Sequence, residues 1–168
     1  MKISAVEEFG LRCLLRVAKA EDPLAASAIS ALEGISIPYV QKLLRLLVSA
    51  NLVIAQRGSK GGFQLAKPAD TISVGEVIRA LGTDTDVDSI CEKNVGNFEH
   101  CCHSTQCTIK PIWTHVFRLV IHTLDNLPLS VLLESPEKVT RELDAIVRPP
   151  VQTFCPVGAL APTSRSNL

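Results

Sequence analysis

The sequence has few aromatic side chains and no long apolar run free of charge. Aromatic residues make up 4% of the 168-residue chain although 46% of it is hydrophobic, so the interior must be built from Leu, Ile, Val and Ala. Helical proteins commonly build their cores in this way. A chain of this length suits one domain, or one compact domain with an appendage, because a single core typically organises about 100–200 residues. We therefore expect a mainly α-helical fold.

Other absences limit the location and the chemistry of the protein. A membrane-spanning helix needs about 18 consecutive apolar residues, and the sequence contains no such stretch. A signal peptide would need an apolar run where Glu7, Glu8 and Arg12 stand. The sequence also lacks a phosphate-binding glycine loop and any nucleophile, base and orienting residue that can be placed together. We expect a cytoplasmic protein that does not associate with membranes and is not an enzyme.

The formal net charge of zero conceals an uneven distribution. Residues 34–69 carry five basic side chains and no acidic one, whereas residues 83–168 carry seven basic and ten acidic side chains. Because phosphate contacts supply most non-specific affinity for nucleic acid, a local basic surface is typical of a DNA-binding protein. The segment 34–69 is therefore the candidate DNA-binding surface.

Helix signals in the first 50 residues predict a helix-turn-helix. Ser4 and Glu7 form a capping box before a helix expected over residues 5–20, and a second helix over 26–33 is stopped by Gly34. A third helix follows the turn 34–36, since Pro38 is acceptable in a first turn. It has an apolar stripe of Val40, Leu43, Leu44 and Leu47 and a polar face of Gln41, Lys42 and Arg45. This is the pattern of a helix that reads bases in the major groove.

Two short strands after the third helix predict a wing. They are expected over residues 52–55 and 63–66, around the glycine-rich basic tip 56–62. Glycines let the tip approach a phosphate or the minor groove, while Arg57 and Lys60 supply charge. Tyr39, at the start of the third helix, is expected either to contact a phosphate or to pack on the turn, and the sequence favours neither. The expected contacts to double-stranded DNA are Ser36, Pro38, Tyr39, Gln41, Lys42, Arg45, Arg57, Ser59, Lys60, Gly61 and Gly62.

The rest of the chain divides into three further segments. A second capping box, Ser73 with Glu76, opens a helix that ends at Gly82 and closes a winged helix-turn-helix domain over residues 1–82. Residues 83–110 form a cysteine-rich loop without periodicity. Residues 111–147 contain a long helix followed by a short helix near 129–134 and another near 136–147. The long helix has too little apolar partner surface and is expected to form a homodimer that binds a palindromic site. Residues 148–168 are expected to be a disordered tail.

Four of the six cysteines lie within 17 residues of this loop, beside two histidines: Cys91, Cys101, Cys102 and Cys107, with His100 and His103. In a reducing compartment such a group indicates metal, cluster or redox chemistry rather than disulfides. Thiolates are preferred ligands of iron–sulfur clusters and of structural zinc. The spacing lacks the paired C-x2-C knuckles typical of a zinc ribbon, so zinc is not favoured. Cys13, on the apolar face of the first helix, is expected to be a core residue.

Several motifs together make the chain resemble the IscR, NsrR and RirA family of winged-helix, iron–sulfur-cluster-sensing regulators. The resemblance extends over residues 2 to about 134. It is carried by residues 2–4, the run 35–44, the wing 57–65, Pro68 with the run 72–78, and the cysteine loop before a long helix.

The resemblance implies a homodimer with one iron–sulfur cluster, 2Fe-2S or 4Fe-4S, in each subunit. Cys91 and Cys107 match the outer ligand positions, and Cys101 matches the middle one better than Cys102 because of its spacing to Cys107. Several relatives have a histidine where this chain has Lys110. Another branch takes a carboxylate from the partner subunit at the position of Glu8, which is the candidate fourth ligand. The substitutes for it are Cys102, His100, His103 and Glu33.

These features predict a transcription regulator, and we expect it to be a repressor. Its DNA affinity would be controlled by a cluster that senses iron, redox state or nitric oxide. One alternative is a winged-helix regulator without a cluster, in which the loop is a thiol or zinc switch. Another is an iron–sulfur electron carrier, which the wing disfavours because a carrier has no use for a helix-turn-helix.

Overall fold

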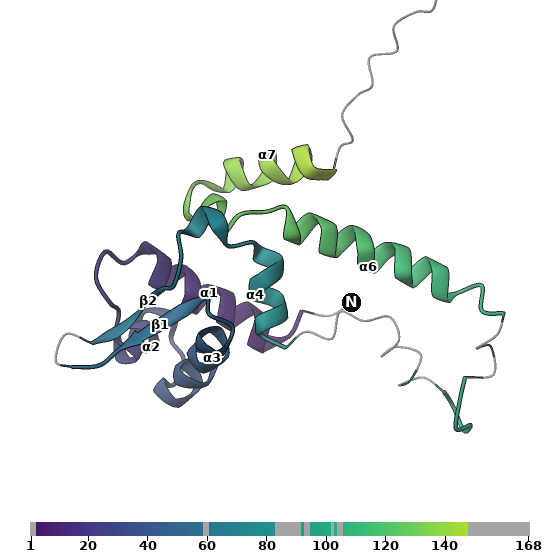
Figure 1. The fold of residues 1–168 in the computed structure, drawn as a ribbon, viewed down its shortest axis with the longest axis horizontal. Coiled ribbons are helices and arrows are strands. Elements are labelled where there is room, and N and C mark those ends of the chain that lie inside the picture. The colour runs from purple at the N-terminus through teal and green to yellow at the C-terminus, as the bar shows by residue number, and fades with distance from the viewer. Residues whose placement is uncertain are drawn as a thin grey trace, which may run out of the picture.

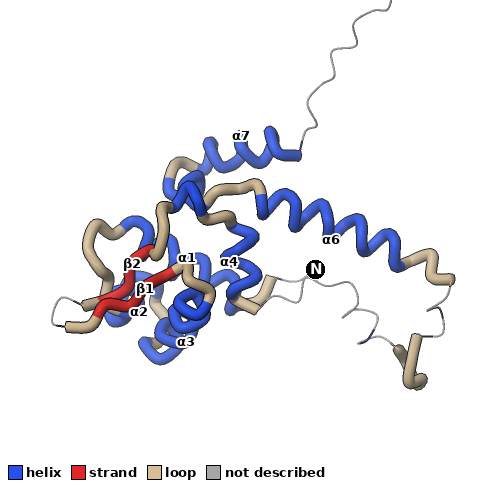
Figure 2. Tube along the Cα trace, in the orientation of Figure 1, coloured by secondary structure: helices blue, strands red, loops and turns tan. Residues whose placement is uncertain are grey.

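Helices make up most of the described chain, with one antiparallel hairpin between the third and fourth of them (Figures 1 and 2). The computed structural model describes residues 3–58, 61–82, 92, 95–101, 103 and 106–147. In chain order the elements are α1 (Ala5–Lys19), α2 (Ala26–Glu33), α3 (Ile37–Ser49), β1 (Val53–Gln56), β2 (Gly62–Leu65), η1 (Ala69–Thr71), α4 (Val74–Ala80), α6 (Lys110–Asp125), η2 (Leu129–Leu133) and α7 (Pro136–Val147). The predicted fold class is confirmed. The predicted tail, 148–168, lies outside the described residues.

The first helix begins where the sequence predicts. The backbone N–H of Glu7 donates to Ser4 Oγ (3.3 Å), and the backbone N–H of Ser4 donates to the Glu7 carboxylate (2.5 Å). This reciprocal bonding satisfies two amides that the helix itself leaves unpaired. Glu7 is only 5% exposed as a result of its place in the cap.

The apolar stripe of α3 packs against α1 to form the centre of the core. Val40, Leu43, Leu44 and Leu47 are all fully buried. They meet a buried stripe on α1 made of Cys13, Leu14 and Val17. The tight turn before α3 depends on Gly34, whose φ of +67° lies in the left-handed region that favours glycine. The predicted helix-turn-helix is therefore present.

A buried acid joins the first two helices. The carboxylate of Glu33, at the end of α2, has a side chain only 3% exposed and accepts Nε–H bonds from Arg12 (2.7 Å) and Arg16 (2.5 Å) of α1. Burial alone would raise the pKa of the Glu33 carboxyl, but the hydrogen bonds and positive charges of Arg16 and Arg12 outweigh it and hold the pKa below its ordinary value. The ion pair therefore favours the charged form of Glu33.

The hairpin is shifted by about one residue from the predicted strands. Val53 pairs with Leu65 and Gln56 pairs with Gly62. Leu24, from the segment between α1 and α2, adds a short bridge by exchanging two backbone hydrogen bonds with Phe63, both 2.9 Å. The wing strands are therefore joined to the helical core by backbone contacts as well as by side chains.

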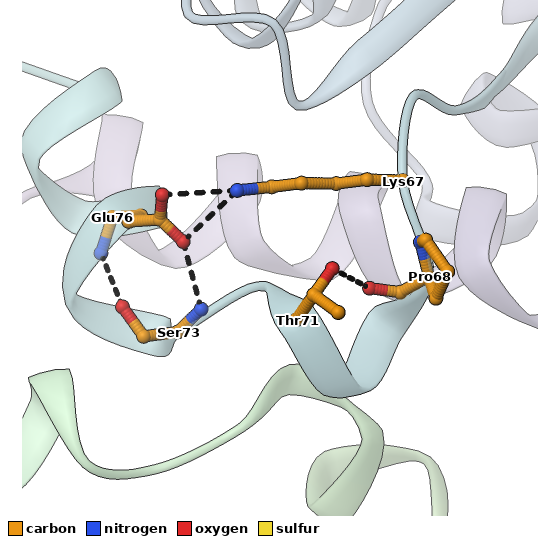
Figure 3. Close-up of polar contacts among 5 residues, drawn as sticks. All are labelled: Lys67, Pro68, Thr71, Ser73 and Glu76. Atoms are coloured by element: carbon orange, nitrogen blue, oxygen red, sulfur yellow. Dashed lines mark hydrogen bonds and ion pairs between the residues drawn. The ribbon is translucent and has the colours of Figure 1, made fainter.

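A second capping box opens α4 and joins it to the wing (Figure 3). The Ser73 N–H donates to the Glu76 carboxylate (3.0 Å), the Glu76 N–H donates to Ser73 Oγ (3.1 Å), and Lys67 Nζ lies 3.0 Å from the same carboxylate. The hydrogen bond from Ser73 and the contact with Lys67 hold the pKa of Glu76 below its ordinary value. Lys67 follows β2 by two residues, so this ion pair ties the base of the wing to α4.

The C-terminal segments pack against the chain around the start of α4. The Val74 N–H donates to Leu127 O (2.9 Å) and the Leu129 N–H donates to Ile72 O (2.8 Å). The predicted short helix is a 3-10 helix, η2, and its Leu129 is fully buried in the same core cluster as α1 and α3. From this junction α6 extends away from the winged part, as Figure 1 shows.

We expect acid to weaken the contact between α1 and α2. The pKa of Glu33 is lower in the folded chain than its ordinary value of 4.5. Its charge therefore stabilises the fold fully above that pH, and this contribution is lost as the pH falls through the lower folded pKa. Glu33→Gln should lower the free energy of unfolding by about 1–3 kcal/mol at neutral pH and by much less in acid, measured by urea denaturation.

A matched control for this variant is Glu21→Gln, since Glu21 is an exposed carboxylate between the same two helices. It should change stability little at any pH. Equal losses in the two variants, or a loss for Glu33→Gln that does not depend on pH, would contradict the role given to the contacts of Glu33 with Arg12 and Arg16.

Candidate DNA-binding face and cysteine loop

The outer face of α3, with its N-cap, presents five of the eleven residues predicted to contact DNA. The exposed residues of this face are Ser36, Pro38, Gln41, Lys42 and Arg45. The helix places them on the side opposite its buried stripe, because both sets follow the 3.6-residue period. Arg45 donates from Nε to Gln41 O at 3.2 Å, which lays its side chain along the helix surface.

Tyr39 differs from its neighbours because its ring is half-buried. It packs edge-on against Phe9 of α1, with ring centroids 6.1 Å apart. The sequence left packing and phosphate contact equally open for this residue, and the structure supplies the packing contact.

The wing tip is described only in part. Arg57 is exposed, whereas Ser59 and Lys60 lie outside the described residues. Gly61 and Gly62 are half-buried, and the chain itself requires them to be glycine. A Cβ at Gly62 would lie 2.7 Å from the backbone carbon of Pro23, and one at Gly61 would lie 2.4 Å from Gln56 O. Both glycines therefore have a packing reason that the sequence did not reveal, and their contact with DNA stays a prediction.

The pairing of charges sharpens the basic surface. Lys67 is engaged by Glu76 and so contributes little net charge to the face. Lys42, Arg45 and Arg57 are exposed and form no ion pair with any other residue that the structure describes. Unpaired cations on one face are available to phosphates without the cost of breaking an internal ion pair.

One exposed residue of α3 was missed by reasoning from the sequence. Ile37 is 42% exposed in the first turn, beside Pro38. Exposed apolar side chains in a major-groove helix are suited to contact the methyl group of thymine. Its place outside the apolar stripe of α3 was the signal that could have identified it.

Two of the predicted loop ligands are described, and both are accessible thiols. Cys101 and Cys107 are free and half-buried. Cys107 lies just before α6, where its sulfur accepts a hydrogen bond from the Lys110 N–H (3.2 Å). His100 and His103 are exposed, while Cys91 and Cys102 lie outside the described residues. Within the described ranges, no group of three or more His, Cys, Asp or Glu side chains could hold a metal ion.

The structure separates three acids that lie near one another in the sequence or the fold. Glu7 is buried in the α1 cap and Glu33 is held by two arginines. Glu8, by contrast, is exposed and forms no ion pair within the described part of the chain. Of the three, Glu8 is the carboxylate that remains available to act as a cluster ligand, and Glu33 is a poor substitute for it.

Cys13 is a core residue, as predicted. It is fully buried, and burial, with a smaller effect from Glu33, raises the pKa of its thiol to about 11. A neutral, inaccessible thiol is neither a ligand nor a nucleophile at neutral pH.

Similarity to known proteins supports a role in transcription regulation. The family model Rrf2, described as an iron-dependent transcriptional regulator, matches residues 3–135. The transcriptional regulator IscR of Vibrio vulnificus is 30% identical over 141 residues, which cover 83% of this chain and 81% of IscR.

Two solved structures of CymR resemble the fold. CymR of B. subtilis, described as its global cysteine regulator, superposes with a TM-score of 0.65 at 26% identity, covering 79% of this chain and 96% of CymR. The oxidised form of Staphylococcus aureus CymR superposes with a TM-score of 0.63 at 29% identity, covering 80% of this chain and 98% of that protein. In the described part of the chain, none of the helices has the length and apolarity needed to cross a membrane.

The different environments of Glu7 and Glu8 lead to a paired prediction. Glu7→Ala should lower the free energy of unfolding by about 1 kcal/mol, because the Ser4 amide loses its acceptor. Glu8→Ala, one residue along the same helix, should change it by no more than about 0.5 kcal/mol. Thermal and urea unfolding of the two variants would measure this. A larger loss of stability for Glu8→Ala would mean that Glu8 stabilises the fold, against its proposed role as a ligand.

Proposed function

The chain belongs to the Rrf2 family of transcriptional regulators, and we propose that it is a homodimeric regulator, acting as a repressor, whose DNA affinity is controlled by an iron–sulfur cluster. The observation that carries this proposal is the combination of an exposed, basic helix-turn-helix face with accessible thiols at the start of the long helix. Such a DNA-binding regulator is expected in the cytoplasm. Iron, redox state or nitric oxide would be its signal.

The DNA-binding role of each residue follows from its position. In the proposed complex α3 (Ile37–Ser49) would lie in the major groove, with Gln41 and Pro38 at base edges and Lys42 and Arg45 at phosphates. Arg57 and Lys60 of the wing contact the backbone of the duplex. Ser36 is suited to a phosphate contact as well, because its side chain makes no capping hydrogen bond with α3.

The surface of α6 supports the homodimer. None of its 16 residues is buried, and Ile112, Trp113, Val116 and Leu119 are each at least 41% exposed. A patch of exposed apolar side chains along one helix is typical of an interface. A second copy of the same helix would cover it in an isologous contact, and the two-fold symmetry would match a palindromic operator.

The donor set of the loop fits an iron–sulfur cluster. Cys101 and Cys107 are free, accessible thiols outside the hydrophobic core, and Cys91 would supply a third thiolate. The partner subunit's Glu8 would be the fourth ligand, with Cys102 or His103 as alternatives. When bound, a cluster supplies iron–thiolate bonds that respond to oxidants and to nitric oxide. A single carboxylate among thiolates would be the most easily exchanged ligand.

A thiol switch is the second candidate, and a specific observation favours it. Cys101 and Cys107 are accessible enough to be oxidised without any metal, and one structural relative is the oxidised form of CymR. Anaerobic purification followed by iron and acid-labile sulfide analysis separates the two candidates. Iron and sulfide in near-equal amounts would support the cluster, and a colourless protein without either would leave the thiol switch.

The proposed DNA contacts predict two kinds of defect. Arg57→Ala and Lys60→Ala should weaken binding to all duplexes. Each should also make the negative slope of log K against log salt shallower by about 0.9, because each loses one phosphate contact. Gln41→Ala should instead cost about 1–3 kcal/mol at one base pair of each half-site and leave the slope nearly unchanged. Fluorescence anisotropy over a range of salt concentrations would measure both.

Arg141→Ala serves as the control for these DNA contacts, since Arg141 is an exposed cation of α7. It should leave both affinity and salt slope unchanged. A normal salt slope for Arg57→Ala, or unchanged sequence preference for Gln41→Ala, would contradict the proposed roles.

The ligand assignment predicts that Cys107→Ala abolishes cluster loading and leaves the fold intact, because the core does not include the loop. Glu8→Ala should retain a cluster that is lost faster in air. Iron and sulfide counts, the visible spectrum and circular dichroism would show this, with Cys155→Ala as the control, because Cys155 is a cysteine outside the proposed ligand loop. A fully loaded Cys107→Ala protein would refute the assignment.

A further inference from the structure

The last turn of α6 is where this helix is fixed to the rest of its own chain. Backbone hydrogen bonds join residues 72–74 to residues 127–129 just beyond this turn. A small apolar cluster of Val74, Leu127 and Val131 lies beside them. Since no residue of α6 is buried, the direction of the helix is set at this end.

Asp125, the last residue of α6, lies directly on the backbone of α4. A Cβ built on Gly75 would lie 1.9 Å from Asp125 Oδ1, 2.9 Å from its Cγ and 3.1 Å from its backbone nitrogen. The first two distances are far shorter than van der Waals contact. A side chain at position 75 would have to displace the Asp125 carboxylate and would lie tightly against the Asp125 backbone nitrogen, so glycine favours this close approach of α6 to α4.

The same carboxylate oxygen is paired one turn further along α4. Arg79 Nη1 lies 2.7 Å from Asp125 Oδ1. An acidic residue at the C-terminus of a helix is unfavourable for the helix dipole, so Asp125 does not stabilise α6 by itself. Its position is accounted for by the contact with Arg79.

The same helix is also joined to the wing. Lys67, two residues after β2, contacts the Glu76 carboxylate at 3.0 and 3.4 Å (Figure 3). α4 therefore carries one ion pair to the end of α6 and another to the base of the wing.

The opposite end of α6 adjoins the cysteine loop, because the Lys110 N–H donates to Cys107 Sγ. Sixteen helical residues extend over about 24 Å at 1.5 Å per residue. A rotation of about 10° at the last turn would move the first turn by about 4 Å, given that helix length. A small change at one end is thus coupled to a larger one at the other.

We propose that Asp125, Gly75 and Arg79 form a joint that sets the direction of α6 relative to α4 and so couples the cysteine loop to the wing. These are positioning residues: none of them is expected to touch DNA or a cluster. The effect on DNA affinity rests on the proposed function, whereas the geometry of the joint does not.

A merely structural role predicts a different result. The side chains of Arg79 and Asp125 are 44% and 38% exposed, and exposed ion pairs contribute little to stability. If the pair only added stability, its removal would lower the melting temperature slightly and change nothing else. A joint predicts altered coupling with almost unchanged stability.

The test uses three variants of the full chain: Gly75→Ala, Asp125→Ala and the double variant. Alanine is the better helix former, so Gly75→Ala would stabilise α4 if no contact opposed it. In the joint it acts as a wedge against the Asp125 carboxylate. The double variant lacks that carboxylate, which removes most of the clash. It also lacks the ion pair between Asp125 and Arg79. Glu134→Ala is the matched control, because the Glu134–Lys138 pair is similarly exposed but lies within the C-terminal segment.

The first measurement is amide hydrogen exchange of Val74 and Leu129, the two donors at the joint. Exchange should be about tenfold faster in Gly75→Ala and should return towards the wild-type rate in the double variant. The control should match the wild type. Unchanged exchange in Gly75→Ala would overturn the joint, whether or not the protein binds a cluster.

The second measurement is the ratio of operator affinities of cluster-loaded and cluster-free protein, with a duplex selected from a random-sequence library. A wild-type ratio of about 5–150-fold is expected from typical allosteric coupling, and it should fall to about twofold or less in Gly75→Ala and Asp125→Ala. A wild-type ratio retained in both variants would overturn the coupling role. A wild-type protein with equal affinities would contradict the proposed function instead, and hydrogen exchange alone would then decide the joint.

Discussion

The backbone pairing between residues 72–74 and 127–129 is the constraint on which the rest of the molecule depends. It brings a segment from after the wing beside one from after the long helix, more than 50 positions away in the sequence. Leu129 enters the main core at this point, and Val74 and Leu127 form the small cluster that supports α6. This pairing, together with the Asp125–Arg79 contact, relates the C-terminal helices to the DNA-binding part of the chain.

Acidic residues show how far the sequence could predict the site. The two capping boxes are local patterns, so Ser4 with Glu7 and Ser73 with Glu76 could be identified from their three-residue spacing alone. The contacts of Glu33 depend on how α1 lies against α2, which no spacing encodes. As a result Glu33 was predicted from the sequence to be a substitute ligand. In the structure its carboxylate is already bound by two arginines. Glu8 could be chosen for resemblance, but its availability became clear only from the burial of its neighbours.

Glycines show the same limit in a different form. A glycine-rich tip between two strands predicted the wing, and the hairpin lies within one residue of the predicted strands. From the sequence alone, approach to DNA was the expected role of these glycines, yet Gly62 is already required by the backbone of Pro23. For Gly75, in the first turn of α4, the sequence alone indicated no role. Its role depends on Asp125, 50 residues away, and so on the tertiary structure.

The long helix links the two halves of the proposed mechanism through its own instability. A helix of 16 residues without a buried side chain gains little from its own chain, and isolated helices of this length are marginal in water. In the proposed dimer, the apolar face around Trp113 and Val116 would be covered by the second copy, and the folding of α6 would be coupled to association. The loop cysteines adjoin one end of α6, and the Asp125 contact lies at the other. A change at the thiols would therefore act on a helix that packs on α4 and α7 of its own chain. A signal at the thiols would then reach the wing only when the dimer has formed, so dimer stability would limit the response.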